Sequence, residues 1–380
     1  MSLSQHFGGR VIKETILVLR LTEDSFSCTT WVPGCPDSAG AWSVWCRDGI
    51  ASDKVDSLAA SHTHRNIMQM EWTSMNEPIK HHFVPQFLLR QFAGPKEKLR
   101  IHRLADASSF TAIVEKTGHR NDGHTLYGAG YGIAGRDRTL LESAMSSLEY
   151  EAAEVIRELR EDSAVDHVSE VQKEALCWFA GLQILRSRFT LGYILRQLEL
   201  EGSKPESFSK EELQTSLLRS ALVPYLDAWS RRSDAEVDVR DRWNPYAGML
   251  NAFRWDIVRF QAPSLVISDA FVAQRGVRTE ARGKFSEIEK NWANHGFVVP
   301  LSECESATMT LTPRIGLHLH RAGFKKRLKA EEFNRNAVYA SRDFVAHAPG
   351  WEKSNPRLKK LMDKNLMLQR SLRRAMPANF

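Results

Sequence analysis

Apolar residues recur every three or four positions through the middle of the chain, which is the spacing of amphipathic helices. The clearest run covers residues 139–159, and further apolar segments cover about 170–200 and 213–229. Each run begins at a pair with the spacing of a capping box: Thr139 with Glu142, Ser169 with Gln172, and Ser209 with Glu212. Three helices in succession predict a helical bundle.

The period of the pattern changes toward the C-terminus. Short runs bounded by turn residues predict strands at 255–260, 264–269, 296–300, 307–312 and 315–320. An earlier strand pair is expected at 99–104 and 110–114, and a last helix at 329–345. We therefore predict an α+β fold, in which a central helical bundle carries a small C-terminal sheet, antiparallel or mixed.

The first 74 residues differ in composition from the rest. They hold three of the five cysteines and four of the ten tryptophans, and apolar periodicity is visible only at 11–21. Their cysteine spacings match no zinc pattern. We expect translation to begin at Met75 and residues 1–74 to be a poorly ordered extension, the alternative being a small cysteine-bearing appendage. A single α+β domain at 75–348 and a basic C-terminal helix at 349–380 would follow.

Positive charge gathers near the C-terminus. Residues 321–376 carry 15 Lys and Arg against 5 Asp and Glu, whereas the whole chain has a net charge of +6. Four of these cations, Lys359, Lys360, Arg373 and Arg374, lie in a segment with an amphipathic pattern. The segment predicts a helix that binds nucleic acid or an acidic partner, and the plainer alternative is a solvated helix face.

No long apolar segment is free of charge. The most hydrophobic stretch, at 175–198, is interrupted by arginines, so no membrane span is expected. The N-terminus lacks the basic, apolar and small-residue regions of a secretory leader. A cytoplasmic location follows by default.

Two adjacent histidines precede a short predicted helix in the sequence KHHFVPQFLLRQF at 80–92. Pro85 suits the first turn of this helix, and Gly94-Pro95 ends it. An imidazole beside a helix N-terminus could meet a phosphate or carboxylate held by free backbone N–H groups. Adjacent residues of a strand point to opposite sides, so only one of His81 and His82 is expected to act as ligand or base. A structural role for these histidines is the favoured interpretation.

Two arginines interrupt the most apolar helix. The guanidinium groups of Arg186 and Arg188 must reach solvent, a carboxylate or an anionic ligand. Glu142 or Glu149 could supply an ion pair, and these two carboxylates, seven positions apart, could also share a metal. We favour an ion pair for at least one arginine.

Other polar residues are weaker candidates. Asp269 ends a predicted strand, and Asn336 and Arg342 are polar positions of the last helix. Metal-capable side chains also occur at His119, Asp122 and His124, where a polar surface loop is the favoured interpretation. His318 and His320 alternate with leucines and predict an exposed strand face. The GAGYGIAG string at 128–135 lacks the strand and acidic residue of a dinucleotide site and is interpreted as a connection.

The 80–92 segment resembles the opening of domain-of-unknown-function family 4238. Shorter segments that are also similar lie at 141–149, 186–188, 266–269, 299–302 and 336–342. Together they span about residues 78–348, and the resemblance implies no activity because the function of that family is not established. In similar proteins the Ser-Asp pair is commonly followed by a residue and a proline, whereas Ala270-Phe271 stands here.

Two classes of function follow from these residues. The first is a metal- or histidine-dependent phosphodiester hydrolase, nuclease-like, with His81, His82, Asp269 and Arg186 as catalytic residues. Arg188, Asn336 and Arg342 would bind substrate, and a divalent metal, if one is bound, would be held by His82 with Glu142. The second is a non-catalytic scaffold that binds a partner or nucleic acid through the basic C-terminal region.

Overall fold

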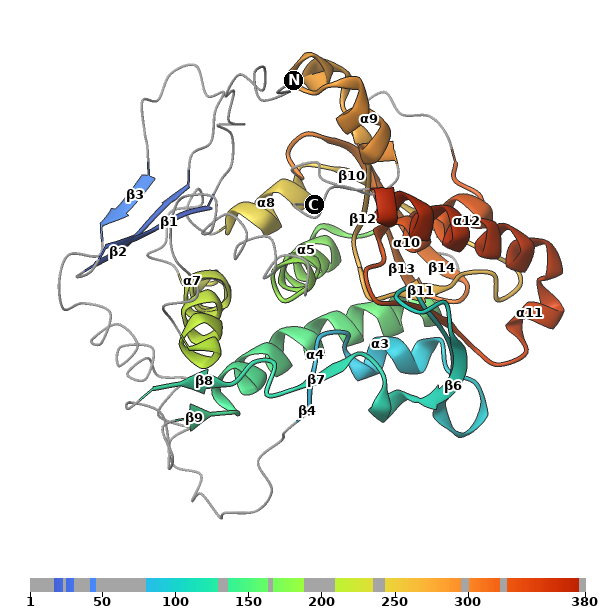
Figure 1. Ribbon diagram of the computed structural model, residues 1–380, viewed down its shortest axis with the longest axis horizontal. Coiled ribbons are helices and arrows are strands. Elements are labelled where there is room, and N and C mark those ends of the chain that lie inside the picture. The colour runs from blue at the N-terminus through green and yellow to red at the C-terminus, as the bar shows by residue number, and fades with distance from the viewer. Residues whose placement is uncertain are drawn as a thin grey trace, which may run out of the picture. The chain divides into compact units, whose positions relative to one another are not determined.

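The computed structural model describes the backbone of residues 17–22, 25–30, 42–45, 80–128, 136–162, 167–187, 209–234, 243–294, 301–321 and 327–375 (Figure 1). The chain divides into two compact units, one of residues 1–75 with 198–205 and the other of the remaining residues. In the first unit, the described segments form a three-stranded antiparallel sheet of β1 (Leu17–Thr22), β2 (Ser25–Thr30) and β3 (Trp42–Trp45).

Helices make up much of the second unit. Those described are α3 (Gln86–Gln91), α4 (Leu140–Glu161), α5 (Glu170–Leu185), α7 (Lys210–Arg231), α8 (Pro245–Asn251), α9 (Glu287–Asn294), α10 (Ala330–Ala340), α11 (Trp351–Ser354) and α12 (Pro356–Ala375). The capping boxes predicted at the starts of α5 and α7 are confirmed, because each serine accepts the N–H of the residue three positions on.

Two four-stranded antiparallel sheets complete the second unit. The first has the order β10 (Arg254–Arg259), β14 (Ile315–His320), β13 (Cys304–Thr312) and β12 (Ala273–Val277). The second has the order β11 (Ile267–Ser268), β15 (Phe344–His347), β5 (Lys98–Arg103) and β6 (Ser109–Ile113). The α+β fold class predicted from the pattern is confirmed, and the C-terminal sheet is antiparallel. Pairing of β15 with β5 was not predicted.

The helical layer packs closely around a tyrosine. The Tyr225 hydroxyl on α7 donates to the carbonyl of Trp178 on α5 at 2.5 Å, and the two rings meet edge to face with centroids 5.2 Å apart. A side chain on Gly181 would collide with the Tyr225 ring. A glycine at this point of α5 therefore lets α7 approach.

The last predicted helix ends earlier than its pattern indicated. α10 stops at Ala340, and residues 344–347 form β15 instead of a helical turn. The Asp269 carboxylate accepts the backbone N–H groups of Arg342, Asp343 and Phe344, at 2.9 to 3.2 Å, which leads the chain out of the helix. The prediction of a helix through residue 345 was wrong. The residue that leads the chain out of the helix lies 73 positions earlier, so the local pattern does not contain its effect.

A second correction concerns β14. His318 and His320 are 1% and 5% exposed, so the predicted exposed strand face is wrong. β14 lies between β10 and β13, and Phe333 of α10 packs on Gly316 of the same strand. A strand covered in this way buries polar and apolar positions alike.

Helix α12 packs on α10 (Figure 1). Met362 and Leu366 are buried in a cluster with Val338, and the Gln369 amide donates to the carbonyl of Tyr339 at 2.6 Å. No helix in the described part of the chain is long and apolar enough to cross a membrane.

Candidate functional site

The histidine motif forms a short strand that pairs with a second histidine-bearing strand. β4 (Lys80–His82) runs antiparallel to β7 (His119–Asn121), so that His81 lies opposite Arg120 and His82 opposite His119. The N–H groups of Phe83 and Val84 both donate to the carbonyl of Gly118, at 2.9 and 3.2 Å. The segment predicted as a turn at 118–124 is thus partly a strand, held against the motif.

The loop after β7 is fixed by its own polar contacts. Asp122 adopts a left-handed conformation with φ of 54°, and its carboxylate accepts from Arg138 Nε at 2.5 Å. The Gln214 amide of α7 donates to the carbonyls of Asp122 and Thr125, at 2.7 and 3.0 Å. This network places the next turn against β4, where a side chain on Gly123 would contact the Cβ of His81. These contacts hold the loop in place against β4 and α7, so it is not a solvated connection.

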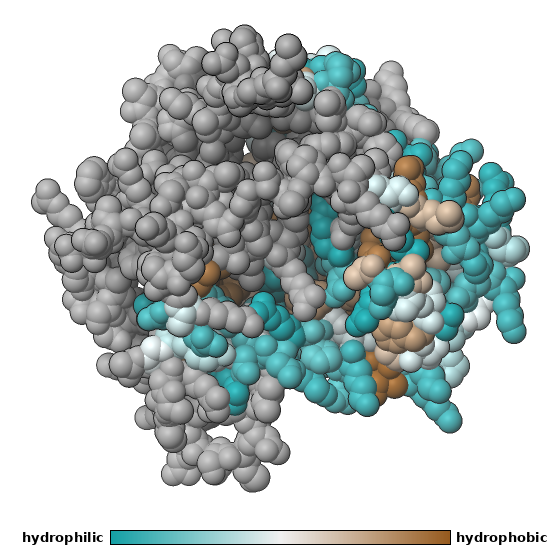
Figure 2. All heavy atoms as spheres, viewed as in Figure 1, coloured by the Kyte–Doolittle hydropathy of each residue, from teal (hydrophilic) through white to brown (hydrophobic). Residues whose placement is uncertain are grey.

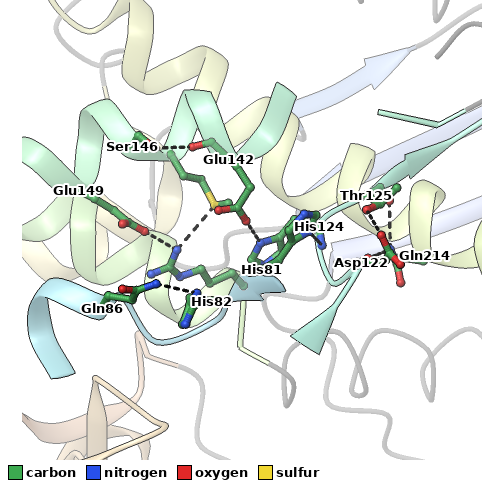
Figure 3. Close-up of polar contacts among 12 residues, drawn as sticks. His81, His82, Gln86, Asp122, His124, Thr125, Glu142, Ser146, Glu149 and Gln214 are labelled. Carbon is green, nitrogen blue, oxygen red and sulfur yellow. Dashed lines mark hydrogen bonds and ion pairs between the residues drawn. The ribbon is translucent and has the colours of Figure 1, made fainter. Parts of the chain in front are cut away.

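The loop carries His124 to Glu142 of α4. His124 Nδ1 lies 2.5 Å from Glu142 Oε1, and the His124 ring stacks on the His81 ring with centroids 5.6 Å apart (Figure 3). His81 and His124 are 1% and 3% exposed, whereas the Glu142 side chain is 30% exposed. One nitrogen or oxygen from each residue lies within 4.8 Å of the others. We call these three residues the His124 group.

Glu142 is available to this group because another residue caps α4. Asp137 Oδ1 accepts the N–H groups of Thr139 and Leu140, at 2.8 and 2.9 Å, and Thr139 makes no side-chain cap. The capping box predicted from Thr139 and Glu142 is wrong. The Asp137 carboxylate stabilises the free N–H groups of the first turn, so Glu142 is free to turn toward His124.

Hydrogen bonds fix the tautomers of the two histidines. His81 Nδ1 accepts the backbone N–H of His124 at 2.7 Å, so the neutral His81 ring carries its proton on Nε2. Because a carboxylate accepts, His124 donates from Nδ1 to Glu142, and its Nε2 makes no hydrogen bond to the described residues. The group thus presents a lone pair on His124 Nε2.

The charges around the group favour an ionised Glu142. Desolvation raises the pKa of Glu142, but the hydrogen bond and charge of His124, together with the charges of His81 and Arg186, lower this pKa below its usual value. A carboxylate that stays charged holds the imidazole in one tautomer and stabilises its protonated form.

Arg186 is the buried cation beside this group. Its Nη1 donates to Glu149 Oε1 at 2.5 Å, and its Nε and Nη2 donate to Gln183 Oε1. The Arg186 side chain is 1% exposed. The ion pair expected for one of the two arginines is therefore with Glu149, while Arg188 lies outside the described residues.

His82 points away from His124. Its Nδ1 lies 3.4 Å from the Gln86 amide nitrogen, and its ring is tilted against the His119 ring with centroids 5.4 Å apart. Burial and the neighbouring His119 lower the pKa of His82 to about 4. The structure therefore places His81, and not His82, with Glu142, as the alternation of strand side chains requires.

The remaining predicted site residues have structural contacts. The Asp269 carboxylate accepts hydrogen bonds from the backbone N–H groups of residues 342–344. Burial raises the pKa of this carboxyl group in spite of those three donors. Arg342 contributes its N–H to this loop. Asn336 is buried in α10 and donates weakly to Thr308 Oγ1 at 3.4 Å. None of these contacts joins the His124 group among the residues that the structure describes.

Sequence reasoning passed over the central residue of the site. His124 follows Asp122-Gly123, which has the composition of an exposed turn. No local signal marks it, because its partner Glu142 is 18 positions away, beyond β8 (Leu126–Tyr127) and β9 (Arg136–Asp137).

Comparison with known proteins adds the family. A family model described as "Protein of unknown function (DUF4238)" matches residues 80–350. No curated protein and no solved structure matches the chain. The matched range contains the whole His124 group.

Proposed function

Since the chain belongs to the DUF4238 family, whose function is unknown, we propose its activity from its own side chains: a histidine-dependent hydrolase of phosphodiester bonds, nuclease-like. The reaction centre is the His124 group. The observation that carries the proposal is the 2.5 Å contact between His124 Nδ1 and Glu142, with His81 stacked beside it.

The proposed mechanism follows from the tautomers. His124 Nε2 takes a proton from a water molecule, and the water oxygen bonds to phosphorus as the ester P–O bond breaks. The proton then passes from His124 to the departing alkoxide. Glu142 stabilises the imidazolium that forms on His124. His81 positions His124, because its Nδ1 accepts the His124 N–H and its ring stacks on the His124 ring.

Arg186 has an electrostatic role in this proposal. Its guanidinium already binds Glu149 and Gln183. Its positive charge adds to the larger effects of His124 and His81, which lower the pKa of Glu142 against desolvation. Asp269 has no role in the proposed mechanism, because its carboxylate accepts backbone N–H groups of the loop before β15. The substrate-binding roles of Asn336 and Arg342 remain predictions without a contact that supports them.

A divalent metal fits the same residues in a second way. An imidazole that donates one N–H to a carboxylate commonly ligates a metal with its other nitrogen. His124 Nε2 would then hold the ion and Glu142 would orient the ring. A chelator would abolish turnover if His124 holds a metal ion, and would leave turnover unchanged if His124 acts as the base without a metal.

The proposal is tested with the full chain and two substrates, bis(p-nitrophenyl) phosphate and a single-stranded oligonucleotide. Each is assayed with Mg²⁺, Mn²⁺ or Zn²⁺ and with chelator. We expect turnover by the parent, a loss of at least about 100-fold in H124Q, and parental turnover in H119Q. His119 is the matched control because it lies on β7, opposite His82 and just before the loop that carries His124, but outside the group. No turnover by the parent, or equal turnover by H124Q, would contradict the proposal.

A second candidate function is the non-catalytic one, and helix α12 favours it. The helix buries its apolar side on α10 and leaves Arg357, Lys360 and Lys364 exposed at spacings of three and four, one face of a helix. Figure 2 shows hydrophilic residues along the outer edge of the described surface, with less polar patches beside them. We propose that this face, which we call the basic face, binds the phosphate backbone of a nucleic acid.

A further inference from the structure

A second pair of buried histidines lies between β5 and β15. Val345 is directly opposite His102 in the register of the two strands, and His347 follows two positions later, so both histidines point to one face of the sheet. His102 Nε2 and His347 Nε2 are 2.9 Å apart. The two residues are 6% and 0% exposed.

The proton arrangement of this pair is determined by its outer partners. His347 Nδ1 donates to the carbonyl of Ala348 at 2.9 Å, so its Nε2 is a lone pair. That lone pair accepts from His102 Nε2–H, and the Ser109 hydroxyl, 2.9 Å from His102 Nδ1, donates in turn. A single proton therefore lies between the two facing nitrogens.

A carboxylate completes the group. Gly350, with φ of 88°, turns the chain into α11, and Glu352 Oε1 comes within 3.6 Å of His347 Nε2. One ligand atom from each of the three residues lies within 4.8 Å of the others. The Trp351 ring covers His347 with centroids 4.8 Å apart. The Glu352 side chain is 20% exposed, so the open side of the group lies at the carboxylate.

These distances match those around a tetrahedral ion. Zinc bonds imidazole nitrogen at about 2.0 to 2.1 Å, so two nitrogens on one zinc are separated by about 3.4 Å. The observed 2.9 Å between the nitrogens and 3.6 Å from nitrogen to carboxylate each differ from that separation by about half an ångström or less. Ligating histidines commonly donate their second N–H to a carbonyl or hydroxyl. Here the carbonyl of Ala348 lies beside His347 Nδ1 and the Ser109 hydroxyl beside His102 Nδ1.

We propose that His102, His347 and Glu352 bind one Zn²⁺ ion and so fasten the C-terminal helices to the sheet. On binding, the proton of His102 moves from Nε2 to Nδ1, and the Ser109 hydroxyl changes from donor to acceptor. Water would take the fourth position. Zinc is favoured over Mg²⁺ because two of the three ligands are imidazoles. The site joins β5 and β15 to α11 directly, and through α11 to α12.

The test isolates this group from the two other groups in the described residues that could hold a metal: the His124 group, and Asp256 with His318 and His320. The full chain therefore carries H124Q and D256N throughout. After treatment with chelator, zinc is titrated by calorimetry, and bound zinc is counted by mass spectrometry. We expect one zinc per chain and a melting temperature that rises with zinc concentration.

Three further substitutions in this background separate a binding site from a packing effect. Glu352→Gln removes a ligand and is expected to weaken zinc at least about 100-fold, and Ser109→Ala about 10-fold through the second shell. Glu97→Gln, an exposed carboxylate elsewhere, should leave the affinity unchanged. Glu352 and Ser109 are not core residues, so neither substitution is expected to prevent folding. No bound zinc in this background, or equal affinity in E352Q, would overturn the proposal. Catalytic turnover is not a readout, so the proposal is independent of the proposed hydrolase.

Discussion

Glu142 lies in the first turn of α4, yet its carboxylate accepts a hydrogen bond from His124, 18 positions earlier in the chain, at 2.5 Å. The contact depends on two local features. Asp137 caps the helix in place of Thr139, and the network around Asp122 holds the loop that carries His124. A prediction follows for each part of this arrangement.

Asp137→Ala should affect both stability and activity. Loss of a helix cap costs about 1 kcal/mol of unfolding free energy, measured by urea denaturation. Glu142 would then be drawn back to the uncapped N–H groups, and turnover should fall as well. Ser209→Ala removes the cap of α7 and is the matched control. It should cost similar stability and leave turnover unchanged. Equal turnover in both variants would show that the cap does not position Glu142.

The ion pair of Arg186 and Glu149 should behave as a buried pair. Glu149→Leu leaves the Arg186 charge, 1% exposed, without its carboxylate, and we expect a loss of about 3 kcal/mol in unfolding free energy. The double substitution R186M/E149L should recover most of that loss, because it removes both charges. A double variant less stable than E149L would contradict the expected coupling.

Acidification should destabilise the fold through buried histidines. Burial lowers the pKa of His82, His102 and His318 from 6.5 to about 4 in each case, with a neighbouring histidine adding to the effect. Between these values the unfolded chain binds protons that the folded chain does not, so stability is full above about pH 6.5 and falls toward pH 4. Each such group contributes a slope of up to about 1.4 kcal/mol per pH unit.

Substitution of one histidine tests that slope. His102→Gln should flatten the dependence of unfolding free energy on pH between 6.5 and 4, measured by urea denaturation at several pH values in the presence of a chelator. Ser109→Ala removes the hydroxyl that contacts the His102 ring but keeps the titrating imidazole, so it serves as the control. An unchanged slope in H102Q would show that His102 is not one of the groups responsible.

The basic C-terminal helix should bind nucleic acid without sequence preference if the second candidate function holds. Replacing the three residues of the basic face, Arg357, Lys360 and Lys364, with Gln should weaken DNA or RNA binding and flatten its dependence on salt. Lys359 pairs with Asp363, and the side chains of Arg373 and Arg374 lie outside the described residues. The parent and the variant are compared by fluorescence anisotropy at several salt concentrations, with turnover expected to be unaffected. If the parent does not bind nucleic acid at low salt, the second candidate function is wrong and the basic face is only a solvated helix face.

Local patterns predicted the elements of this fold better than their partners. The helices α4, α5 and α7 and the strands β5, β6, β13 and β14 follow from periodicity and turn residues, which act over a few positions. Pairing of β15 with β5 joins segments about 245 positions apart, and no local signal records it. The end of α10 was misplaced for the same reason, because Asp269 acts from a distant turn.

The candidate site was predicted in part. Alternation along a strand correctly separates His81 from His82, but it does not say which of them faces Glu142. His124 was passed over because a histidine after Asp-Gly has the appearance of a solvated turn. Asp269 was expected at the site because a carboxylate at a strand end has the same sequence whether it faces a cleft or binds the backbone.

The central claim is that the His124 group faces the scissile phosphate, and a crystal structure tests it most directly. Crystals of the full chain would be soaked with Mn²⁺ and a phosphorothioate dinucleotide that resists hydrolysis. We predict the thiophosphate next to His124, with the attacking water or a metal ion within reach of His124 Nε2, about 2.6 to 3.2 Å for a hydrogen bond. A dinucleotide bound elsewhere, with no phosphate oxygen or water reaching His124 Nε2, would contradict it.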